Sequence, residues 1–214
     1  MTMKDYSYFL FDADGTLIDT MDLIVRCFEH TCATFGNPAV AADEIMKNVG
    51  LTLREQMRVL FGPLTDERFE VIAAEHMAFQ LKQYPRYLRA FPGVPEGLAL
   101  LASRGKKCAV VTSRKRATLE IYLKETGLYG YFEAFITAEN TQRHKPDPEP
   151  ALAALTQMSA QKDCSLFVGD SSFDMECAHR AGIDSAFVNW SRNDPSGFPV
   201  QPTFFIDEVR QLCA

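Results

Sequence analysis

The sequence has no long hydrophobic run, no excess of positive charge and no low-complexity tract. No apolar run approaches the roughly 18 residues that a membrane-spanning helix needs. The 22 lysines and arginines are outnumbered by 28 aspartates and glutamates, which gives a net charge of −6. Because no basic stripe offers a surface to nucleic acid or to an anionic membrane, we expect neither as a partner.

Cysteine and histidine patterns typical of disulfide, zinc or thiol chemistry are also missing. None of the six cysteines forms a C-x-x-C pair, and the four histidines show no H-x-x-x-H or H-E-x-x-H spacing. The N-terminus has no apolar core followed by a small-residue cleavage site, as a signal peptide would have. We therefore expect reduced cysteines and a cytoplasmic location.

What the sequence does contain is a globular composition, 47% hydrophobic and 23% charged, with short apolar runs separated by helical patterns. The apolar runs lie at residues 6–11, 108–111, 134–136, 165–168, 185–188 and 203–206. Helical patterns between them cover residues 116–125, 149–157 and 173–181. This alternation predicts an α/β fold, a Rossmann-like doubly wound parallel sheet with helices on both faces.

One long stretch departs from the alternation, because residues 16–84 show helical spacing and no convincing strand. The core-facing positions expected on its last helix are Phe69, Ile72, Ala73, Met77 and Leu81. Three prolines mark the return to the sheet, Pro85, Pro92 and Pro95. Such a stretch is too long for a simple crossover. We therefore expect a core domain over residues 1–15 and 90–214, and an inserted α-helical cap domain over residues 16–89.

The most informative motif is DADGTL, which begins at Asp12 directly after the first predicted strand. Its carboxylates, Asp12 and Asp14, are two residues apart, and buried acids so close together need a cation or shifted pKa values. The carboxyl ends of parallel strands line the ligand crevice of a doubly wound sheet. On its own the motif also fits a polar turn with solvated acids.

Further polar segments lie after or near other predicted strands, and their chemical groups are Thr112, Ser113, Lys145, Asp170 and Asp174. Acids for a divalent metal, hydroxyl groups and one ammonium are the parts of a site that clamps an anion. Structural alternatives exist for each segment. Thr112 and Ser113 can cap the following helix, Lys145 can be an exposed loop lysine, and Asp174 can complete a capping box.

Taken together and in this order, the four segments resemble the four motifs of the haloacid dehalogenase (HAD) superfamily. The resemblance covers the whole chain, including a helical cap inserted after the first motif. It implies that Asp12 is a nucleophile and Asp14 a general acid and base. It also implies that Thr112 and Ser113 bind the phosphoryl group, while Lys145 steadies the charge of the nucleophile and of that group.

The same resemblance implies Mg²⁺ as the cofactor, held by Asp12, Asp170 and the backbone carbonyl of Asp14, with Asp174 in support. The implied reaction is hydrolysis of a small phosphorylated metabolite through an aspartyl-phosphate intermediate. Asp14 argues against the metal-free dehalogenases and the phosphonatases of the superfamily, because both lack this second aspartate.

Residues that select the substrate are expected in the cap and beside the phosphoryl site. The segment GLTLR, which ends at Arg54, resembles a cap segment of phosphoglycolate phosphatases. Arg54 or Lys47 can meet a substrate carboxylate or a second phosphate, or can be an ordinary exposed residue. Arg114, in the run TSRKR, resembles the pyrophosphatases of the same subfamily and can widen the clamp for a diphosphate, or simply begin a solvated helix.

Phosphoglycolate is therefore the first expected substrate and pyrophosphate the second. A phosphomutase of the β-phosphoglucomutase kind shares every core motif and is a further alternative. A phosphate-binding protein without turnover is ranked last, since such a protein has no need of an acid at Asp14. We expect a small phosphorylated metabolite as the partner, and a monomer or a homodimer.

Overall fold

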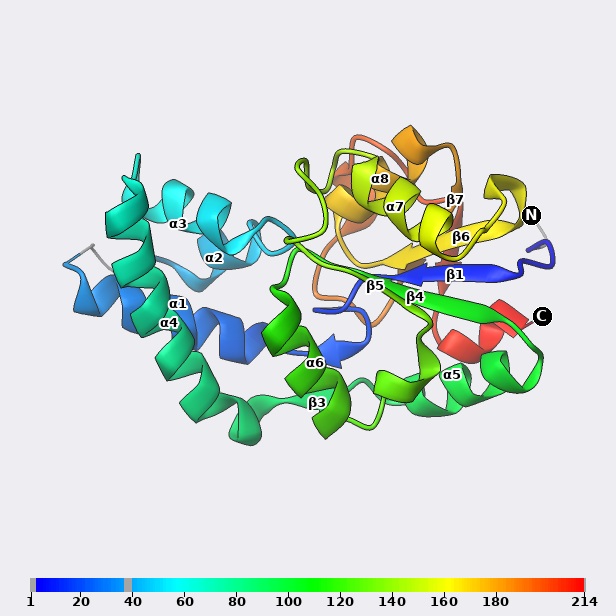
Figure 1. Cartoon of the computed structure of the whole chain (residues 1–214), viewed down its shortest axis with the longest axis horizontal. Coiled ribbons are helices and arrows are strands. Elements are labelled where there is room, and N and C mark those ends of the chain that lie inside the picture. Colours follow the sequence, from blue (N-terminus) through cyan, green and yellow to red (C-terminus); the bar gives the residue numbers. More distant parts are fainter. Residues whose placement is uncertain (1–2, 37–39, 214) are drawn as a thin grey trace.

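A six-stranded parallel sheet lies at the centre of the computed structural model, which describes residues 3–36 and 40–213 (Figure 1). Its strands are β1 (Tyr8–Phe11), β4 (Lys107–Val111), β5 (Ala134–Ile136), β6 (Ser165–Gly169), β7 (Asp184–Val188) and β8 (Phe204–Ile206). They pair in the order β5-β4-β1-β6-β7-β8, so β1 lies inside the sheet between β4 and β6. The predicted α/β doubly wound sheet is confirmed, and each predicted apolar run overlaps one of its strands to within two residues at either end.

Helices cover both faces of this sheet because its strands are apolar on both sides. On one face lie α7 (Glu149–Gln157) and α8 (Ser172–Ala181), and on the other α5 (Val94–Ser103) and α6 (Arg116–Glu125). Within β1, Phe9 and Phe11 pack with α5 and α6, whereas Leu10 packs with α7 and α8. Burying each of these side chains contributes about 1.5–3 kcal/mol. Short 3₁₀ helices occupy Tyr129–Tyr131, Lys162–Cys164, Pro195–Gly197 and Val209–Cys213.

Four helices form a group beside the carboxyl end of the sheet, which we call the helical layer (Figure 1). They are α1 (Met21–Thr34), α2 (Ala42–Met46), α3 (Leu53–Phe61) and α4 (Asp66–Tyr87). The layer has its own apolar cluster, to which Phe28, Ile45, Met57 and Ile72 belong. A capping box between Thr52 and Glu55 explains why α3 begins where it does.

The two connections between the helical layer and the sheet run side by side. Ile18–Asp19 forms β2 and Arg89–Ala90 forms β3, and the two short strands pair antiparallel. The expectation of no strand within residues 16–84 was therefore wrong at β2. A two-residue ladder is too short to show any periodicity, and its partner lies far along the chain. The division into core and cap domains stays a prediction.

Helix α4 differs from its prediction in both its buried face and its end. Leu81 is 43% exposed, whereas His76 and Gln80 are only 3% and 5% exposed. The buried face of α4 thus includes two polar side chains that were not among the core-facing positions expected from hydrophobic periodicity. The helix also continues past Pro85 to Tyr87, since the loss of one hydrogen bond in a last turn is tolerated. In the described part of the chain no helix is both long and apolar enough to cross a membrane.

Candidate active site

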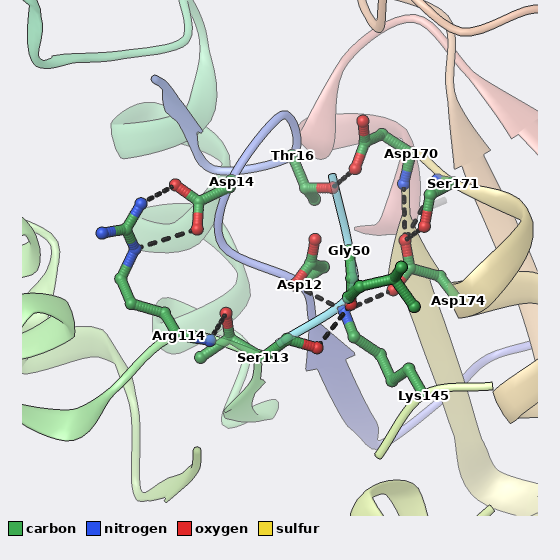
Figure 2. A network of polar contacts seen from close by, with 12 residues as sticks. Asp12, Asp14, Thr16, Gly50, Ser113, Arg114, Lys145, Asp170, Ser171 and Asp174 are labelled. Atoms are coloured by element: carbon green, nitrogen blue, oxygen red, sulfur yellow. Dashed lines mark hydrogen bonds and ion pairs between the residues drawn. The ribbon is translucent and has the colours of Figure 1, made fainter. Parts of the chain in front are cut away.

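A buried lysine joins two of the predicted acids at the carboxyl edge of the sheet (Figure 2). Asp12 follows β1, and Asp174 lies in the first turn of α8 after β6. Lys145 Nζ donates to Oδ1 of Asp12 and to Oδ1 of Asp174, each at 2.7 Å. The Lys145 side chain is 1% exposed, so the alternative of an exposed loop lysine is excluded.

The charges in this cluster stabilise one another. Burial alone would lower the pKa of Lys145, but the Asp12 and Asp174 carboxylates raise it, so the side chain is an ammonium. Burial raises the pKa of Asp12, the Lys145 ammonium opposes that shift, and Asp174 adds to it. A buried charge of this kind persists only where it is paired and hydrogen-bonded, as Lys145 is.

Asp170, at the end of β6, receives hydrogen bonds but no ammonium or guanidinium from the described residues. Thr16 Oγ1 donates to Oδ1 at 3.3 Å, while Ser191 Oγ and Asn193 Nδ2 each donate to Oδ2 at 3.2 Å. Burial, followed by the negative charges of Asp174 and Asp12, raises the pKa of Asp170 well above its usual range. The carboxyl group of Asp170 therefore lacks a positive partner.

The acids around Asp170 fit a divalent cation. Carboxylate oxygens of Asp12, Asp170 and Asp174 lie within 4.8 Å of one another, and all three residues are buried. Carboxylate oxygens are the ligands that Mg²⁺ prefers in proteins. A cation here would supply the positive charge that Asp170 lacks, so the donor set and its electrostatics match a metal of this kind.

Asp174 also holds the loop that carries Asp170. Its Oδ2 accepts from the amide nitrogens of Asp170 and Ser171 at 3.2 and 3.0 Å, and from Ser171 Oγ at 2.7 Å. The Asp174 side chain therefore takes part both in the capping box of α8 and in the ion pair with Lys145. Gly169 makes this possible, because a Cβ there would lie 2.5 Å from Cβ of Asp174.

Asp14 makes a different set of contacts from Asp12. Arg114 donates from Nε to Oδ2 at 2.9 Å and from Nη2 to Oδ1 at 2.6 Å, and the Thr20 hydroxyl donates to Oδ1 as well. Burial would raise the pKa of Asp14, but Arg114 and Thr20 together hold it below its usual range. Arg114 is 8% exposed at its side chain, so the alternative of a solvated helix start is wrong for this residue. Gly15 turns the chain beside Asp170 with a φ of 84°.

Thr112 and Ser113 follow β4 and do not cap the next helix, since the N-cap of α6 is Lys115. Thr112 is buried, lines the same cleft as Asp12, and accepts a hydrogen bond from the Arg114 amide at 3.2 Å. The Ser113 hydroxyl donates to the carbonyl oxygen of Gly50 in the helical layer (Figure 2). Ser113 therefore joins the sheet edge to the loop before α3.

The two cap candidates lie in different places. Arg54 Nη1 donates to Asp66 at 2.7 Å, and its guanidinium lies 3.9 Å from the centre of the Phe69 ring. Arg54 is thus engaged within the helical layer, outside the lining of the cleft that contains Asp12. Lys47 lines a second hollow that reaches Asp170.

The cleft at Asp12 extends beneath the helical layer and encloses about 630 Å³, including space open to solvent. Its far wall carries Gln56 from α3 and His76 and Gln80 from α4. None of these three residues was predicted from the sequence. For His76 and Gln80 a signal was available, because both polar residues lie at helical spacing from the buried positions of α4 and so indicate a polar site on its buried face.

The two partners of Asp170, Ser191 and Asn193, were also not predicted, because no residue of the loop that follows β7 was a candidate from the sequence. This loop leaves the same edge of the sheet as the catalytic candidates. Ligands bind at the carboxyl ends of parallel strands, so Ser191 and Asn193 could have been predicted as site residues from their place in this loop.

Comparisons with known proteins agree with this geometry. A sequence model of the haloacid dehalogenase-like hydrolases matches residues 9–188. A protein of Caldanaerobacter subterraneus subsp. tengcongensis, named provisionally as pyrophosphatase PpaX, is 33% identical over 204 residues, covering 95% of this chain and 91% of that protein. Pyrophosphatase PpaX of Bacillus pumilus is 31% identical over 206 residues, covering 96% and 94%. A solved Bacteroides fragilis structure, named provisionally as a haloacid dehalogenase-like hydrolase, is 27% identical with a TM-score of 0.86, covering 97% and 100%.

Proposed function

Because the chain belongs to the haloacid dehalogenase-like hydrolases, we propose that it is a Mg²⁺-dependent phosphatase that acts on a small phosphorylated metabolite through an aspartyl-phosphate intermediate. The observation that carries the proposal is the buried contact of Lys145 with Asp12 and Asp174. This contact presents a carboxylate nucleophile next to a fixed positive charge, at the edge of the sheet where ligands bind.

In the first half of the reaction, Asp12 displaces the leaving group from phosphorus. Lys145 holds Oδ1 of Asp12, which leaves Oδ2 to attack. As the new O–P bond forms, the bond from phosphorus to the leaving oxygen breaks, and that oxygen takes a proton from the carboxyl group of Asp14. Lys145 and the Thr112 hydroxyl bind the phosphoryl oxygens as their charge develops.

In the second half, water attacks the phosphorus of the aspartyl phosphate and gives a proton to Asp14. The bond between Asp12 and phosphorus breaks, orthophosphate leaves and the Asp12 carboxylate returns. Arg114 and Thr20 hold Asp14 as a carboxylate, which is the form that accepts this proton. The protonated form needed in the first half requires Oδ2 of Asp14 to leave Arg114 Nε, while Oδ1 keeps its contacts with Arg114 and Thr20.

Asp12, Asp170 and the backbone carbonyl of Asp14 are the groups that we propose to hold Mg²⁺, with Asp174 positioning Asp170. When bound, the ion offsets the repulsion between an anionic ester and the Asp12 carboxylate. The raised pKa of Asp170 supports this assignment, because it marks a carboxyl group that no ammonium or guanidinium of the described residues contacts.

We further propose that residues 16–89 act as a cap over the phosphoryl site. The contact of Ser113 with Gly50 and the cleft between Asp12 and α4 support this role. Phosphoglycolate is the substrate suggested by the sequence, and pyrophosphate is suggested by the names of the two relatives. Both belong in the test.

The test is phosphate release from a panel of phosphoglycolate, pyrophosphate, sugar phosphates and an aryl phosphate, with Mg²⁺ and with EDTA. We expect release that depends on Mg²⁺. Replacing Asp12 by asparagine keeps the shape but removes the nucleophile, so kcat should fall by on the order of 10³-fold or more. Circular dichroism should show that Asp12→Asn remains folded.

Asp163→Asn is the matched control, because Asp163 is exposed in a 3₁₀ helix and lies outside both hollows. Its rates should equal those of the wild type. Wild-type rates in Asp12→Asn would refute the assignment of the nucleophile, and undiminished rates in EDTA would refute the requirement for a metal.

A further inference from the structure

Two carboxamide side chains on the far wall of the cleft have unused hydrogen-bonding capacity. Gln80 is 5% exposed and its amide has no hydrogen-bond partner among the described residues. Gln56 Nε2 donates to the carbonyl oxygen of Leu51 at 2.9 Å, but its Oε1 is buried and without a partner in the described chain. A buried polar atom without a partner is costly, as Gln56 Oε1 is, and the Gln80 amide lines the cleft with its hydrogen-bonding capacity free, so a ligand can satisfy both.

His76 adds a hydrogen-bond acceptor to the same wall. The single proton of the Thr31 hydroxyl is donated to the carbonyl oxygen of Cys27 at 2.6 Å. The 3.0 Å contact between Thr31 Oγ1 and His76 Nδ1 must therefore run from Nδ1–H to the hydroxyl oxygen. Burial, aided by the charge of Arg114, lowers the pKa of His76 to about 3, so the ring is neutral. Nε2 is then an acceptor, with no partner among the described residues.

Positive charge is scarce along this cleft. Arg114 is occupied by both oxygens of Asp14, and Lys145 by Asp12 and Asp174. Among the described residues of the lining, Lys115 is the cation without a carboxylate partner, and it is exposed at the start of α6. An anionic leaving group would therefore meet acceptors, carboxylates and the paired Arg114, with Lys115 at the exposed start of α6 as the unpaired cation of the described lining.

Apolar side chains complete the wall, since Ile24 and Phe28 from α1 line the same cleft, as do Leu53 and Met77. Apolar surfaces of this kind pack against carbon skeletons, while the few polar groups between them set the orientation of a ligand. The combination suits a molecule with C–H surfaces and O–H donors.

From this juxtaposition of Gln56, His76 and Gln80 beside the phosphoryl site, we propose that the enzyme selects phosphate esters with an uncharged, polyhydroxylated leaving group, a sugar or a linear polyol. The proposal rests on the phosphatase function proposed above and specifies its substrate class. It ranks such esters ahead of phosphoglycolate, whose leaving group carries a carboxylate, and ahead of pyrophosphate, whose leaving group is a second phosphate. Hydroxyl groups would donate to the acceptors on the wall, and a site built for such bonds discriminates strongly against substrates without them.

The experiment measures kcat/KM with Mg²⁺ for a hexose 6-phosphate, glycerol 3-phosphate, phosphoglycolate, pyrophosphate and an aryl phosphate. We expect the better of the two hydroxylated esters to exceed phosphoglycolate and pyrophosphate by about 100-fold or more. The hexose and glycerol esters separate a cyclic from a linear leaving group. A higher kcat/KM for phosphoglycolate or pyrophosphate than for both hydroxylated esters would overturn the proposal.

Variants then test the wall itself. Gln80→Leu keeps the side-chain volume but removes the amide, so the ratio of kcat/KM for the preferred hydroxylated ester to that for the aryl phosphate should fall by about 10-fold or more. Gln83→Leu is the matched control on the same helix, outside the cleft lining, and should keep the wild-type ratio. Should Gln80→Leu fail to fold, Gln56→Met provides the same test from α3.

The aryl phosphate distinguishes failure of the proposed substrate class from failure of the proposed phosphatase function. Release of phosphate from it, without any preference for hydroxylated esters, would overturn this inference and leave the phosphatase function standing. No Mg²⁺-dependent release from any compound would overturn the phosphatase function and the substrate class together. An unchanged ratio in both Gln80→Leu and Gln56→Met would refute the role of this wall.

Discussion

Three aspartates at the site, Asp12, Asp14 and Asp170, differ in their pKa shifts because their nearest neighbours differ. Asp14 faces a guanidinium, and its pKa is held low. Among the described residues, Asp170 receives hydrogen bonds from hydroxyl and amide donors, and burial and the charges of Asp174 and Asp12 raise its pKa. Asp12 shares the Lys145 ammonium with Asp174. The residue type therefore identifies the acids, while the neighbouring groups determine the pKa of each one.

His76 allows a test of protonation at the residue scale. Its pKa is lowered to about 3 in the folded chain, chiefly by burial, whereas an unfolded histidine titrates near 6.5. Between these values the unfolded chain binds a proton that the folded chain does not, so stability must fall as the pH falls. The contribution of His76 is fully present above about pH 6.5 and decreases by up to about 1.4 kcal/mol per pH unit below it.

Urea unfolding of the wild type and of His76→Phe between pH 7.5 and 4.5 measures this contribution. The free energy of unfolding of the wild type should fall more steeply with acidification than that of the variant, because phenylalanine has no proton to bind. His179→Phe, at an exposed position on α8, is the matched control. Parallel curves for the wild type and His76→Phe would contradict a neutral buried His76.

Among the elements, the loop between α2 and α3 joins the helical layer directly to the site. Gly50 accepts a hydrogen bond from Ser113 and adopts a φ of 111°, which favours glycine. A Cβ at this position would lie 2.7 Å from Cδ2 of Phe173, next to the loop that carries Asp170. Position 50 therefore has no room for a side chain beside the site.

Gly50→Ala should accordingly lower kcat/KM by about 10-fold or more, because a shift of about 1 Å can misalign reacting groups that strongly. Gly62→Ala is the control, since Gly62 also has a positive φ, of 75°, but has open space around its Cβ position. Both variants should lose stability through backbone strain, and only Gly50→Ala should lose activity. Equal kcat/KM values for the two variants would show that the Phe173 contact is irrelevant to catalysis.

On the scale of the whole molecule, the helical layer and the sheet are joined by two chain segments that meet in one ladder. Ile18 pairs with Ala90 and Asp19 with Arg89, so both connections lie at the same point. The helical layer also has an apolar cluster separate from the two clusters that cover the sheet. The junction is thus a candidate hinge, and a turn about it would change the packing of Leu23 and Cys27 of α1, which belong to the cluster on the α5 and α6 face of the sheet.

Hydrogen exchange tests whether this junction is a hinge. Adding Mg²⁺ and orthophosphate should slow amide exchange in residues 16–20 and 84–92, because a ligand at the site favours one arrangement of the layer. Exchange in α7, which packs on the sheet away from the junction, is the internal reference. If both junction segments exchange at the same rate with and without ligand, the proposed division into core and cap at residues 16–89 fails.

Much of the fold and of the phosphoryl site could be predicted from local sequence. The strands follow from short apolar runs, and Asp12, Thr112 and Asp170 were expected at one sheet edge because parallel strands all end there. Capping boxes at Thr52 and Ser171 are equally local signals. These features depend on neighbours within a few residues, or on a rule of topology that holds for every doubly wound sheet.

The sequence by itself thus determined the class of sheet, the order of the acids along the chain and the family resemblance. Only the tertiary structure decided that Arg114 binds Asp14 and that His76 and Gln80 are buried in a cleft that also contains Asp12. The physical reason is the same in both cases. Periodicity places a polar side chain on a helix face or in a loop, but its protonation and partners depend on segments far along the chain that fold against it.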